Sequence, residues 1–393
     1  MPSVMIVAAA RTAVGDFGGA LRDVPPCELG ATVVRAVLER AGVAGDAVGH
    51  VAFGHVINTE PRDMYLSRVA ALEAGLPHAV PAFNVNRLCG SGLQAIVSAA
   101  QTILLGDAEA AIGGGAESMS RAPYIVPSHR WGARMGDSAM LDMMAGALSD
   151  PFDRVHMGVT AENVAARYGV SRADQDALAA QSHRRAAAAI DAGRFREQIV
   201  PVAVRTRKGE TRVDTDEHVR RDVTAEGLAA LKPVFQRKNG TVTAGNASGL
   251  NDGAAAVLLM SDDAAGRHGA APLARLVAYA HAGVDPRYMG MGPVPATRAV
   301  LERAGLTAEQ LDVIEANEAF AAQACAVTRE LGLDPARVNP NGSGIALGHP
   351  IGATGAMLTV KAVYELQRVK GRYALVTMCI GGGQGIAAIF ERV

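Results

Sequence analysis

Apolar residues along the chain follow two patterns, one with helical spacing and one of short uninterrupted runs. Val37, Leu38 and Ala41 recur at helical spacing, and Gly42 can end such a helix in the left-handed conformation. Residues 92–105 form a longer segment rich in Ala, Ile and Leu that ends at Gly106. These patterns predict two helices, 35–41 and 92–105.

Strand-like runs occupy residues 48–54 and 311–315, and short, largely apolar runs occupy residues 108–112 and 374–380. Strands that are buried on both faces have this pattern, because neither face needs polar residues. Since these runs alternate with helical segments, the sequence predicts a layered α/β architecture.

The pattern occurs twice along the chain. Residues 35–42 recur unchanged as residues 298–305. A Val-Asn pair followed by Gly-Ser-Gly occurs in 85–92 and again in 338–344, and Ile-Gly-Gly-Gly occurs at 112–115 and 380–383. Three matches in the same order indicate a duplicated domain. We assign residues 1–118, together with about 250–269, to the first half and residues 270–393 to the second.

Residues 119–249 differ in composition from the two copies of the repeat and are predicted to be an insertion between them. Ser171 and Asp174 form a capping box that opens a helix running to about Asp191, with Gly193 as its terminator. The insertion is also rich in arginine, including Arg220. Interleaved acidic residues make a solvated surface the simplest explanation, and a lid that binds a phosphate-bearing ligand is the alternative.

Composition narrows the possible functions. The 393 residues carry a net charge of −1, so nothing suggests nucleic acid or an anionic membrane as a partner. We expect no apolar run of the ~18–20 residues that span a bilayer, and the N-terminus lacks a basic targeting region, so a cytoplasmic location is expected. Four cysteines without a CxxC pair suggest neither a disulfide scaffold nor a metal site.

Cys89 lies where an apolar strand meets the helix over 92–105, with Gly90 and Gly92 permitting a sharp turn. A thiol at a helix N-terminus experiences the positive end of the dipole, which predicts a lowered pKa and a reactive thiolate. Free backbone N–H groups at the same place could stabilise an oxyanion.

Three possible partners of this cysteine lie in the second half. His349 sits in a glycine-dense loop, 341–355, and is a candidate general base. Cys379 ends a buried strand at a position where the first copy has Ala111, so the fold does not require a cysteine there. Asn317 follows another strand within an unusually polar run.

Together these residues resemble the thiolase family over essentially the whole chain. The motifs that carry the resemblance are 86–92 around Cys89, Asn-Glu-Ala-Phe at 317–320, Gly-His-Pro at 348–350 and Cys-Ile-Gly-Gly-Gly at 379–383. Residues 243–249 and 156–158 match the biosynthetic branch, and the chain is most similar to bacterial β-ketothiolases that supply polyhydroxyalkanoate synthesis. The resemblance implies the thiolase fold, a duplicated layered α/β/α/β/α arrangement with an inserted loop domain.

The resemblance also implies the chemistry. His349 would deprotonate Cys89, which would form an acyl-enzyme with an acyl-CoA, and Cys379 would deprotonate acetyl-CoA, whose carbanion would then release a 3-ketoacyl-CoA. The enolate oxygen would meet His349 and a water held by Asn317, and the tetrahedral oxygen would meet the N–H groups of Cys89 and Gly381. No cofactor other than the CoA thioester substrates is implied.

The expected binding contacts and assembly come from the same resemblance. Arg220 would meet the phosphates of CoA, and the remaining contacts would line the pantetheine and acyl path: Ala244, Ser248, Ala319, Phe320, Leu148, His156, Met157 and Met289. Acetyl-CoA, short acyl-CoA and CoA are thus the expected partners. A homotetramer built as a dimer of dimers is expected, with part of 119–140 as a contact.

Other functional classes make different demands on these residues. A decarboxylating ketoacyl synthase would need two histidines around the nucleophile, whereas Cys379 takes the place of one of them here. A degradative 3-ketoacyl-CoA thiolase and a non-catalytic CoA- or lipid-binding module of the same fold are the alternatives. A dinucleotide-binding oxidoreductase is disfavoured, because Gly113–Gly115 lacks GxGxxG spacing.

Overall fold

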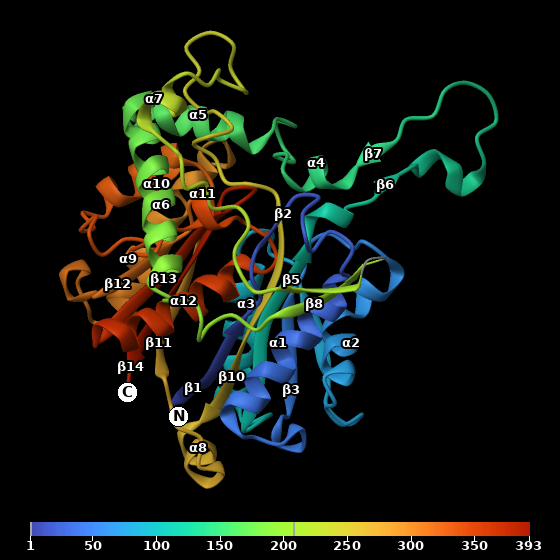
Figure 1. Cartoon of the computed structure of the whole chain (residues 1–393), viewed down its shortest axis with the longest axis vertical. Helices are drawn as coiled ribbons and strands as arrows, with labels where there is room; N and C mark the ends of the chain where they lie inside the picture. The colour runs from blue at the N-terminus through green and yellow to red at the C-terminus, as the bar shows by residue number, and fades with distance from the viewer. Residues whose placement is uncertain (1, 207–208) are drawn as a thin grey trace.

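One large mixed sheet forms the centre of the molecule (Figure 1). The computed structural model describes residues 2–206 and 209–393. The long strands of the sheet are β1 (Val4–Arg11), β3 (His50–Gly54), β4 (Ala82–Val85), β5 (Ala110–Ser118), β10 (Asn251–Ser261), β11 (Ala274–Gly283), β12 (Val313–Ala316), β13 (Tyr373–Ile380) and β14 (Gln384–Arg392). Their spatial order is β12-β13-β14-β11-β1-β10-β5-β3-β4, and the short β2 (Gly15–Asp16) pairs with β10.

The sheet consists of two halves with the same topology. From the junction outward, the first half runs β1-β10-β5-β3-β4, and the second runs β11-β14-β13-β12 and then a parallel bridge between Ile314 and Val338. The halves join where β1 and β11 pair antiparallel at Met5 with Arg275 and at Ile6 with Ala274. Strands of matching rank along the chain hold matching places in space, as the sequence repeat predicts.

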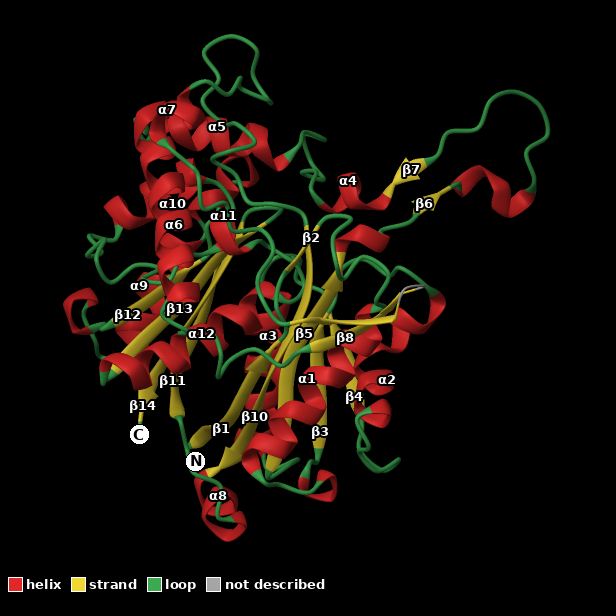
Figure 2. Cartoon of the chain, viewed as in Figure 1, coloured by secondary structure: helices red, strands yellow, loops and turns green. Residues whose placement is uncertain are grey.

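Helices complete a five-layer arrangement, which Figure 2 shows by element type. The helices α3 (Ser91–Leu105) and α12 (Thr354–Val369) contact each other and share one apolar core with both half-sheets. The first half-sheet is covered on its other face by α1 (Pro26–Ala41), and the second by α9 (Pro293–Ala304). The predicted α/β/α/β/α arrangement is confirmed.

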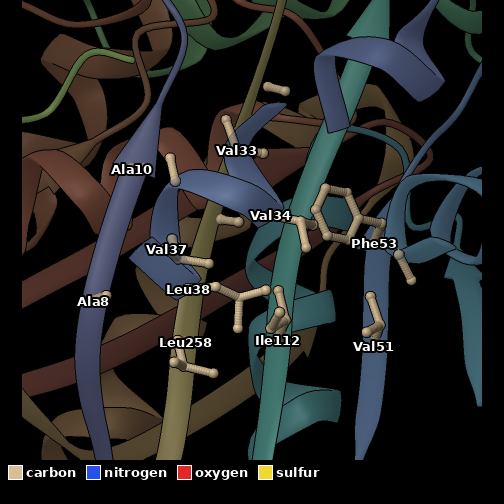
Figure 3. Packing of buried hydrophobic residues seen from close by; sticks show 14 of the residues in the cluster. Ala8, Ala10, Val33, Val34, Val37, Leu38, Val51, Phe53, Ile112 and Leu258 are labelled. Carbon is tan, nitrogen blue, oxygen red and sulfur yellow. The ribbon is translucent and has the colours of Figure 1, made fainter. Parts of the chain in front are cut away.

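The contact of α1 with the sheet shows how apolar spacing becomes packing (Figure 3). Val33, Val34, Val37 and Leu38 point from one face of α1 onto β1, β10, β5 and β3, where Phe53 and its neighbours receive them. Burying each such side chain contributes about 1.5–3 kcal/mol. The predicted terminator Gly42 has φ 62°, and Gly106 ends α3 in the same way with φ 82°.

The predicted strands are present with shifted bounds: β12 starts at Val313 rather than Leu311 and β13 at Tyr373 rather than Ala374, and two further strands differ for a visible reason. β3 starts at His50 rather than Val48, because a 3₁₀ turn over Gly45–Ala47 precedes it. β5 continues to Ser118, well past Ile112, because its glycines extend the strand instead of ending it. A Cβ on Gly113 would lie 2.6 Å from the Ile96 Cα, so glycine there allows α3 to pack directly on the strand.

The expectation that no apolar run reaches membrane-spanning length was wrong for one stretch. Leu88–Leu105 is long and apolar enough to cross a membrane by length and composition. In the structure 56% of this stretch is buried inside the protein, where it packs between the half-sheets. A helix covered on most sides by other elements needs an apolar surface all round, which accounts for its composition.

The inserted region forms a helical cap and a projecting arm (Figure 1). Its helices are α4 (Met143–Ala147), α5 (Met157–Arg167), α6 (Arg172–Asp191) and α7 (Ala225–Ala229), and its hairpin consists of β8 (Val202–Thr206) and β9 (Gly209–Val213). The arm leaves and returns through β6 (Tyr124–Ile125) and β7 (Leu141–Asp142). The predicted capping box is present, since Ser171 and Asp174 each accept a hydrogen bond from the other's backbone N–H.

The remaining helices are short or stand beside this cap. They are α2 (Leu66–Glu73), α8 (Asp262–His268), α10 (Ala321–Glu330) and α11 (Gly344–Leu347). α10 packs against α5 and α6, so it ties the cap to the second half.

Candidate active site

A cavity of about 430 Å³ lies between the cap and the strand and helix ends of both halves. All of the residues proposed from the sequence, except Asn317, line this cavity: Cys89, His349, Cys379, Gly381, Arg220, Ala244, Ser248, Leu148, His156, Met157, Met289, Ala319 and Phe320. Its lining is predominantly apolar. The thiols of Cys89 and Cys379 and the ring of His349 come from three different segments of the chain. A largely apolar cavity with few polar groups is typical of a ligand site.

Cys89 stands just before α3 in a tightly bonded turn. The Ser91 hydroxyl donates to the Leu88 carbonyl at 2.6 Å and accepts from the Arg87 N–H at 2.8 Å. A Cβ on Gly90 would lie 2.6 Å from Ile380 Cδ1, so glycine lets this turn approach the end of β13.

The predicted lowering of the Cys89 pKa was wrong. Burial raises the pKa of Cys89 to about 11, although backbone N–H groups of Gly381 and of Cys89 itself act in the opposite direction. Cys89 is half-buried and belongs to an apolar cluster that includes Met144 and Leu148 of the cap, and these surroundings reduce the contact of the thiol with water. The desolvation of a charged sulfur outweighs these backbone hydrogen bonds, so the resting nucleophile is a thiol.

His349 is buried, and its hydrogen bonds define its tautomer. The Thr354 hydroxyl donates its hydrogen to the Pro350 carbonyl at 2.9 Å, so its oxygen must accept from His349 Nδ1, 2.7 Å away. Nδ1 therefore carries the proton, and Nε2 carries the lone pair. Burial lowers the pKa of His349 to about 4, so the ring is neutral and able to act as a base at neutral pH.

Asn317 lies against this histidine rather than in the cavity lining. Its Nδ2 is 3.4 Å from His349 Nε2, and its backbone carbonyl accepts from Gln323 at 3.3 Å. A Cβ on Gly344 would lie 2.7 Å from Asn317 Oδ1, so glycine at that position leaves room for the amide. The structure thus places the amide beside the basic nitrogen of His349.

Cys379 ends β13 and is fully buried. Burial raises the pKa of Cys379 above its ordinary value, and the nearby Cys89 raises it further. Gly382 and Gly383 have φ 81° and 85°, left-handed conformations that other residues rarely adopt, and they turn the chain directly after the strand. A high thiol pKa means that the Cys379 thiolate, once formed, is a strong base.

An aromatic group closes one side of the cavity. The His156 ring stacks on Phe235 with centroids 4.6 Å apart, and Phe235 meets Phe320 edge-on at 6.4 Å. A Cβ on Gly158 would lie 2.1 Å from the Phe235 ring, so this stack requires glycine there. His156 Nδ1 accepts the Gly158 N–H at 3.0 Å, and burial lowers the pKa of His156, so this ring is neutral with Nε2 as the donor.

Arg220 supplies positive charge to the lining. Its side chain is exposed, and its backbone N–H donates to His183 Nδ1 of α6 at 3.1 Å. The neighbouring His218 pairs with Asp16 at 2.8 Å, which fixes this segment to β2 of the first half. An exposed guanidinium held by an ordered backbone suits a phosphate-bearing ligand.

Sequence reasoning missed several lining residues, including Met119, Met144, His218, Phe235 and Ile351. Ile351 lies within the glycine-dense loop and could have been found there. Phe235 stands in a polar connection without periodicity, and only the tertiary structure brings it against His156.

Comparisons with known proteins agree with this arrangement. Residues 4–263 match the model for the thiolase N-terminal domain, and residues 270–392 match that for the thiolase C-terminal domain. The chain is 70% identical to beta-ketothiolase BktB of Cupriavidus necator, with 99% of each chain covered. Its fold matches the crystal structure of the Bacillus anthracis acetyl-CoA acetyltransferase with a TM-score of 0.98 at 47% identity, covering 100% of this chain and 99% of the other.

A third match carries the ligand expected for such a cavity. Human mitochondrial 3-ketoacyl-CoA thiolase, solved in complex with CoA, matches with a TM-score of 0.96 at 44% identity, covering 100% of this chain and 98% of the other. Two family models that together cover nearly the whole chain, and relatives of this identity, leave one conclusion: the chain belongs to the thiolase family.

Proposed function

We propose that the protein is a β-ketothiolase that condenses acetyl-CoA with acetyl-CoA or another short acyl-CoA to a 3-ketoacyl-CoA and CoA, reversibly, through an acyl-Cys89 intermediate. The observation that carries this proposal is the meeting of two thiols and a neutral histidine in one apolar cavity. The degradative and condensing directions use the same groups, so both belong to one mechanism.

The resting protonation states of the two thiols and of His349 suit thiolysis, the direction in which CoA cleaves a 3-ketoacyl-CoA. Both thiols hold their protons, because burial raises the pKa of each, and His349 is neutral. His349 Nε2 takes the Cys89 proton while sulfur attacks the 3-keto carbon of the substrate. The bond between C2 and C3 then breaks, and C2 takes the proton of Cys379, which gives acetyl-CoA, acyl-Cys89 and a Cys379 thiolate.

The second half-reaction restores the resting state. The Cys379 thiolate takes the thiol proton of an incoming CoA, whose sulfur attacks the acyl group on Cys89. The Cys89 sulfur leaves and takes back the proton from His349. Condensation follows the same steps in reverse, with Cys379 removing the proton from the methyl carbon of acetyl-CoA.

Backbone N–H groups would stabilise the negative oxygens. The N–H groups of Cys89 and Gly381 already direct their hydrogens at the Cys89 sulfur, and the tetrahedral oxygen on the attacked carbon would form within their reach. The enolate oxygen would accept hydrogen bonds from His349 and from a water held by Asn317. Losing one such donor typically costs about 10²–10³ in kcat.

CoA would occupy the rest of the cavity. The exposed Arg220 would meet its phosphates, and the pantetheine arm would pass Ala244, Ser248 and Ala319. Leu148, Met157 and Met289 would wall the acyl group, and His156 would donate from Nε2 to an oxygen of the arm. A pantetheine arm has both amide groups and apolar stretches, which fits a mixed lining of this kind.

The test is CoA-dependent cleavage of acetoacetyl-CoA, followed by loss of its enolate absorbance, in wild type and Cys89→Ala. We expect rapid cleavage by wild type and none above background by Cys89→Ala. Cys325→Ala is the matched control, because Cys325 lies in α10 outside the cavity lining. It should cleave at the wild-type rate.

The outcome also separates the alternatives. A folded wild type that binds CoA but cleaves neither acetoacetyl-CoA nor longer 3-ketoacyl-CoAs would be a binding module. Cleavage of long substrates only would favour a degradative thiolase.

The assembly is part of the same proposal. The arm between β6 and β7 exposes large apolar side chains, with Trp131 91% and Met135 99% exposed. Such a surface is unusual for a monomer and suits a contact with another copy. A homotetramer, a dimer of dimers joined through this arm, is therefore our model, and a cytoplasmic location remains a prediction from the sequence.

A further inference from the structure

Glu117 is a buried carboxylate that has no place in the mechanism above. It lies near the end of β5 in the first half, is fully buried, and does not line the cavity. A buried carboxylate is costly unless hydrogen bonds compensate for the lost water, so its partners indicate its purpose.

These partners are backbone N–H groups from two segments. Glu117 Oε2 accepts from Gly352 at 2.9 Å and from Val56 at 3.1 Å, and Oε1 accepts from Ile57 at 3.2 Å. Gly352 belongs to the second half and lies three residues after His349. The carboxylate, which stands on β5, thus joins the loop that carries the base to the segment that directly follows β3.

The fit around Gly352 is too close to allow a side chain at this position or at the glycines facing it. A Cβ on Gly352 would lie 2.4 Å from Glu117 Oε2. Cβ atoms on Gly54 and Gly115 would lie 2.6 Å and 2.3 Å from the Gly352 carbonyl oxygen. Glycines on three segments therefore allow the loop to sit directly on the strand ends, where the carboxylate can reach it.

The charged groups around Glu117 are few. Burial raises its pKa, while His55, 3.3 Å away through Nδ1, and the three N–H donors favour the carboxylate. Asp63 lies beyond His55, at 4.0 Å from its Nε2. The negative charge of Glu117 also acts on the nucleophile, since it adds to the raised pKa of Cys89.

We infer that Glu117 is a positioning residue for the reaction: its ionised carboxylate ties the His349 loop of the second half to the first half and so fixes the base relative to Cys89. This inference rests on the proposed function for its kinetic readout. It assigns to the β5 end a role in catalysis that acts through His349 and not on substrate.

Two substitutions separate the reach of the side chain from its charge. Glu117→Asp keeps the charge but is one methylene shorter, so it should release Gly352. We expect kcat for acetoacetyl-CoA thiolysis to fall about 10–10²-fold, the usual cost of a displaced catalytic group, with KM for CoA within about twofold of wild type. The pH midpoint of Cys89 alkylation by iodoacetamide should stay at the wild-type value.

Glu117→Gln keeps the length and removes the charge. Its pH midpoint of Cys89 alkylation should move to lower pH, because a negative charge near the thiol has gone. Gly352→Ala approaches the same contact from the loop, and should lower kcat as Glu117→Asp does without moving the alkylation midpoint. It also replaces Glu117→Asp as the test of the tether if that variant does not unfold cooperatively.

Asp63→Asn is the matched control, because it removes a buried carboxylate next to the same histidine but away from the loop. It should retain wild-type kcat. The inference is overturned if Glu117→Asp and Gly352→Ala turn over like wild type, or if Glu117→Gln leaves the alkylation midpoint unchanged. Absence of cleavage by wild type itself would instead contradict the proposed function, and the alkylation profiles would still test the charge.

Discussion

The tautomer of His349 depends on the hydroxyl of Thr354, a residue that does not line the cavity. Thr354 accepts the Nδ1 hydrogen because its own hydrogen is given to the Pro350 carbonyl. A ring held in the other tautomer would present N–H, rather than a lone pair, to Cys89. The tautomer is therefore set by a residue of the first turn of α12.

Thr354→Val tests this arrangement, since valine has the same shape without the hydroxyl. We expect kcat for thiolysis to fall about 10–10²-fold, because the base is no longer held in the productive tautomer. Thr354→Ser keeps the hydroxyl and should stay within about threefold of wild type. Equal rates in the valine and serine variants would contradict the assignment.

The pH dependence of catalysis follows from the neutral state of His349. The imidazole must be unprotonated to accept the Cys89 proton, and burial lowers its pKa to about 4. As pH falls, the base should thus remain available to about pH 5 and be lost only near pH 4. The measurement is kcat/KM for acetoacetyl-CoA across this range, with thermal unfolding at each pH as the control. An acid limb centred near 6.5 would show an unshifted histidine.

For single residues, the sequence predicted which side chains meet in the cavity better than it predicted their pKa values. Cys89 and His349 stand out because glycines surround them, and Cys379 stands out because the first copy of the repeat has Ala111 at the equivalent position. The pKa of Cys89 was predicted in the wrong direction, because it depends on which apolar side chains of the cap close over the thiol. Those side chains are distant in sequence, and no local pattern identifies them.

Among the elements, α6 links the cap to the segment that carries Arg220. His183 accepts the Arg220 N–H through Nδ1, and burial lowers the pKa of His183 to about 4. Its neutral form is thus favoured in the folded state. Folded protein binds fewer protons at this site than unfolded protein between pH 6.5 and 4, so stability is lost as pH falls through this window.

His183→Asn removes this titration. Relative to its own value at pH 7, the wild type should lose more stability by pH 4.5 than the variant, by a difference on the order of 3 kcal/mol. Urea unfolding at the two pH values measures it. Parallel losses in both proteins would show that His183 does not titrate in this window.

The sequence predicted those elements whose ends carry local signals. The C-terminal ends of α1 and α3 and the start of α6 were placed correctly, because Gly42, Gly106 and the capping box at Ser171 act within one turn, whereas α1 begins at Pro26, nine residues before the predicted start. β5 was predicted too short, because its three glycines suggest a turn when read alone and a close helix contact only when α3 is in place. The arm has no periodic pattern that predicts its path.

At the scale of the molecule, the arm between β6 and β7 projects from the rest of the protein and exposes large apolar side chains. Substituting Trp131→Glu together with Met135→Glu should reduce the mass of the assembly in light scattering, because two charges would have to be buried at the contact. Leu105→Glu changes an equally exposed apolar residue, 78% exposed, at the end of α3 and should leave the mass unchanged. An unaltered mass in the arm variant would place the contact elsewhere.

The duplication explains why the site lies where it does. Cys89 lies between β4 and α3 of the first half, and His349 lies between the equivalent Val338 segment and α12 of the second half, so the connections that lead into the two central helices carry the nucleophile and the base. The first half supplies the nucleophile and the second half supplies the base, so neither half contains the whole site. The repeat could be found from the sequence, whereas the way in which the two copies are oriented toward each other could not.

The junction of the half-sheets has a consequence for the ends of the chain. Met5 pairs with Arg275, and Arg275 pairs with Glu391, so the first and last strands lie two strand spacings apart, about 10 Å. A linker of about four residues could close the chain into a ring. Reopened between Ala271 and Pro272, such a circular permutant would begin with the second half and end with the first, and we expect it to assemble the same sheet.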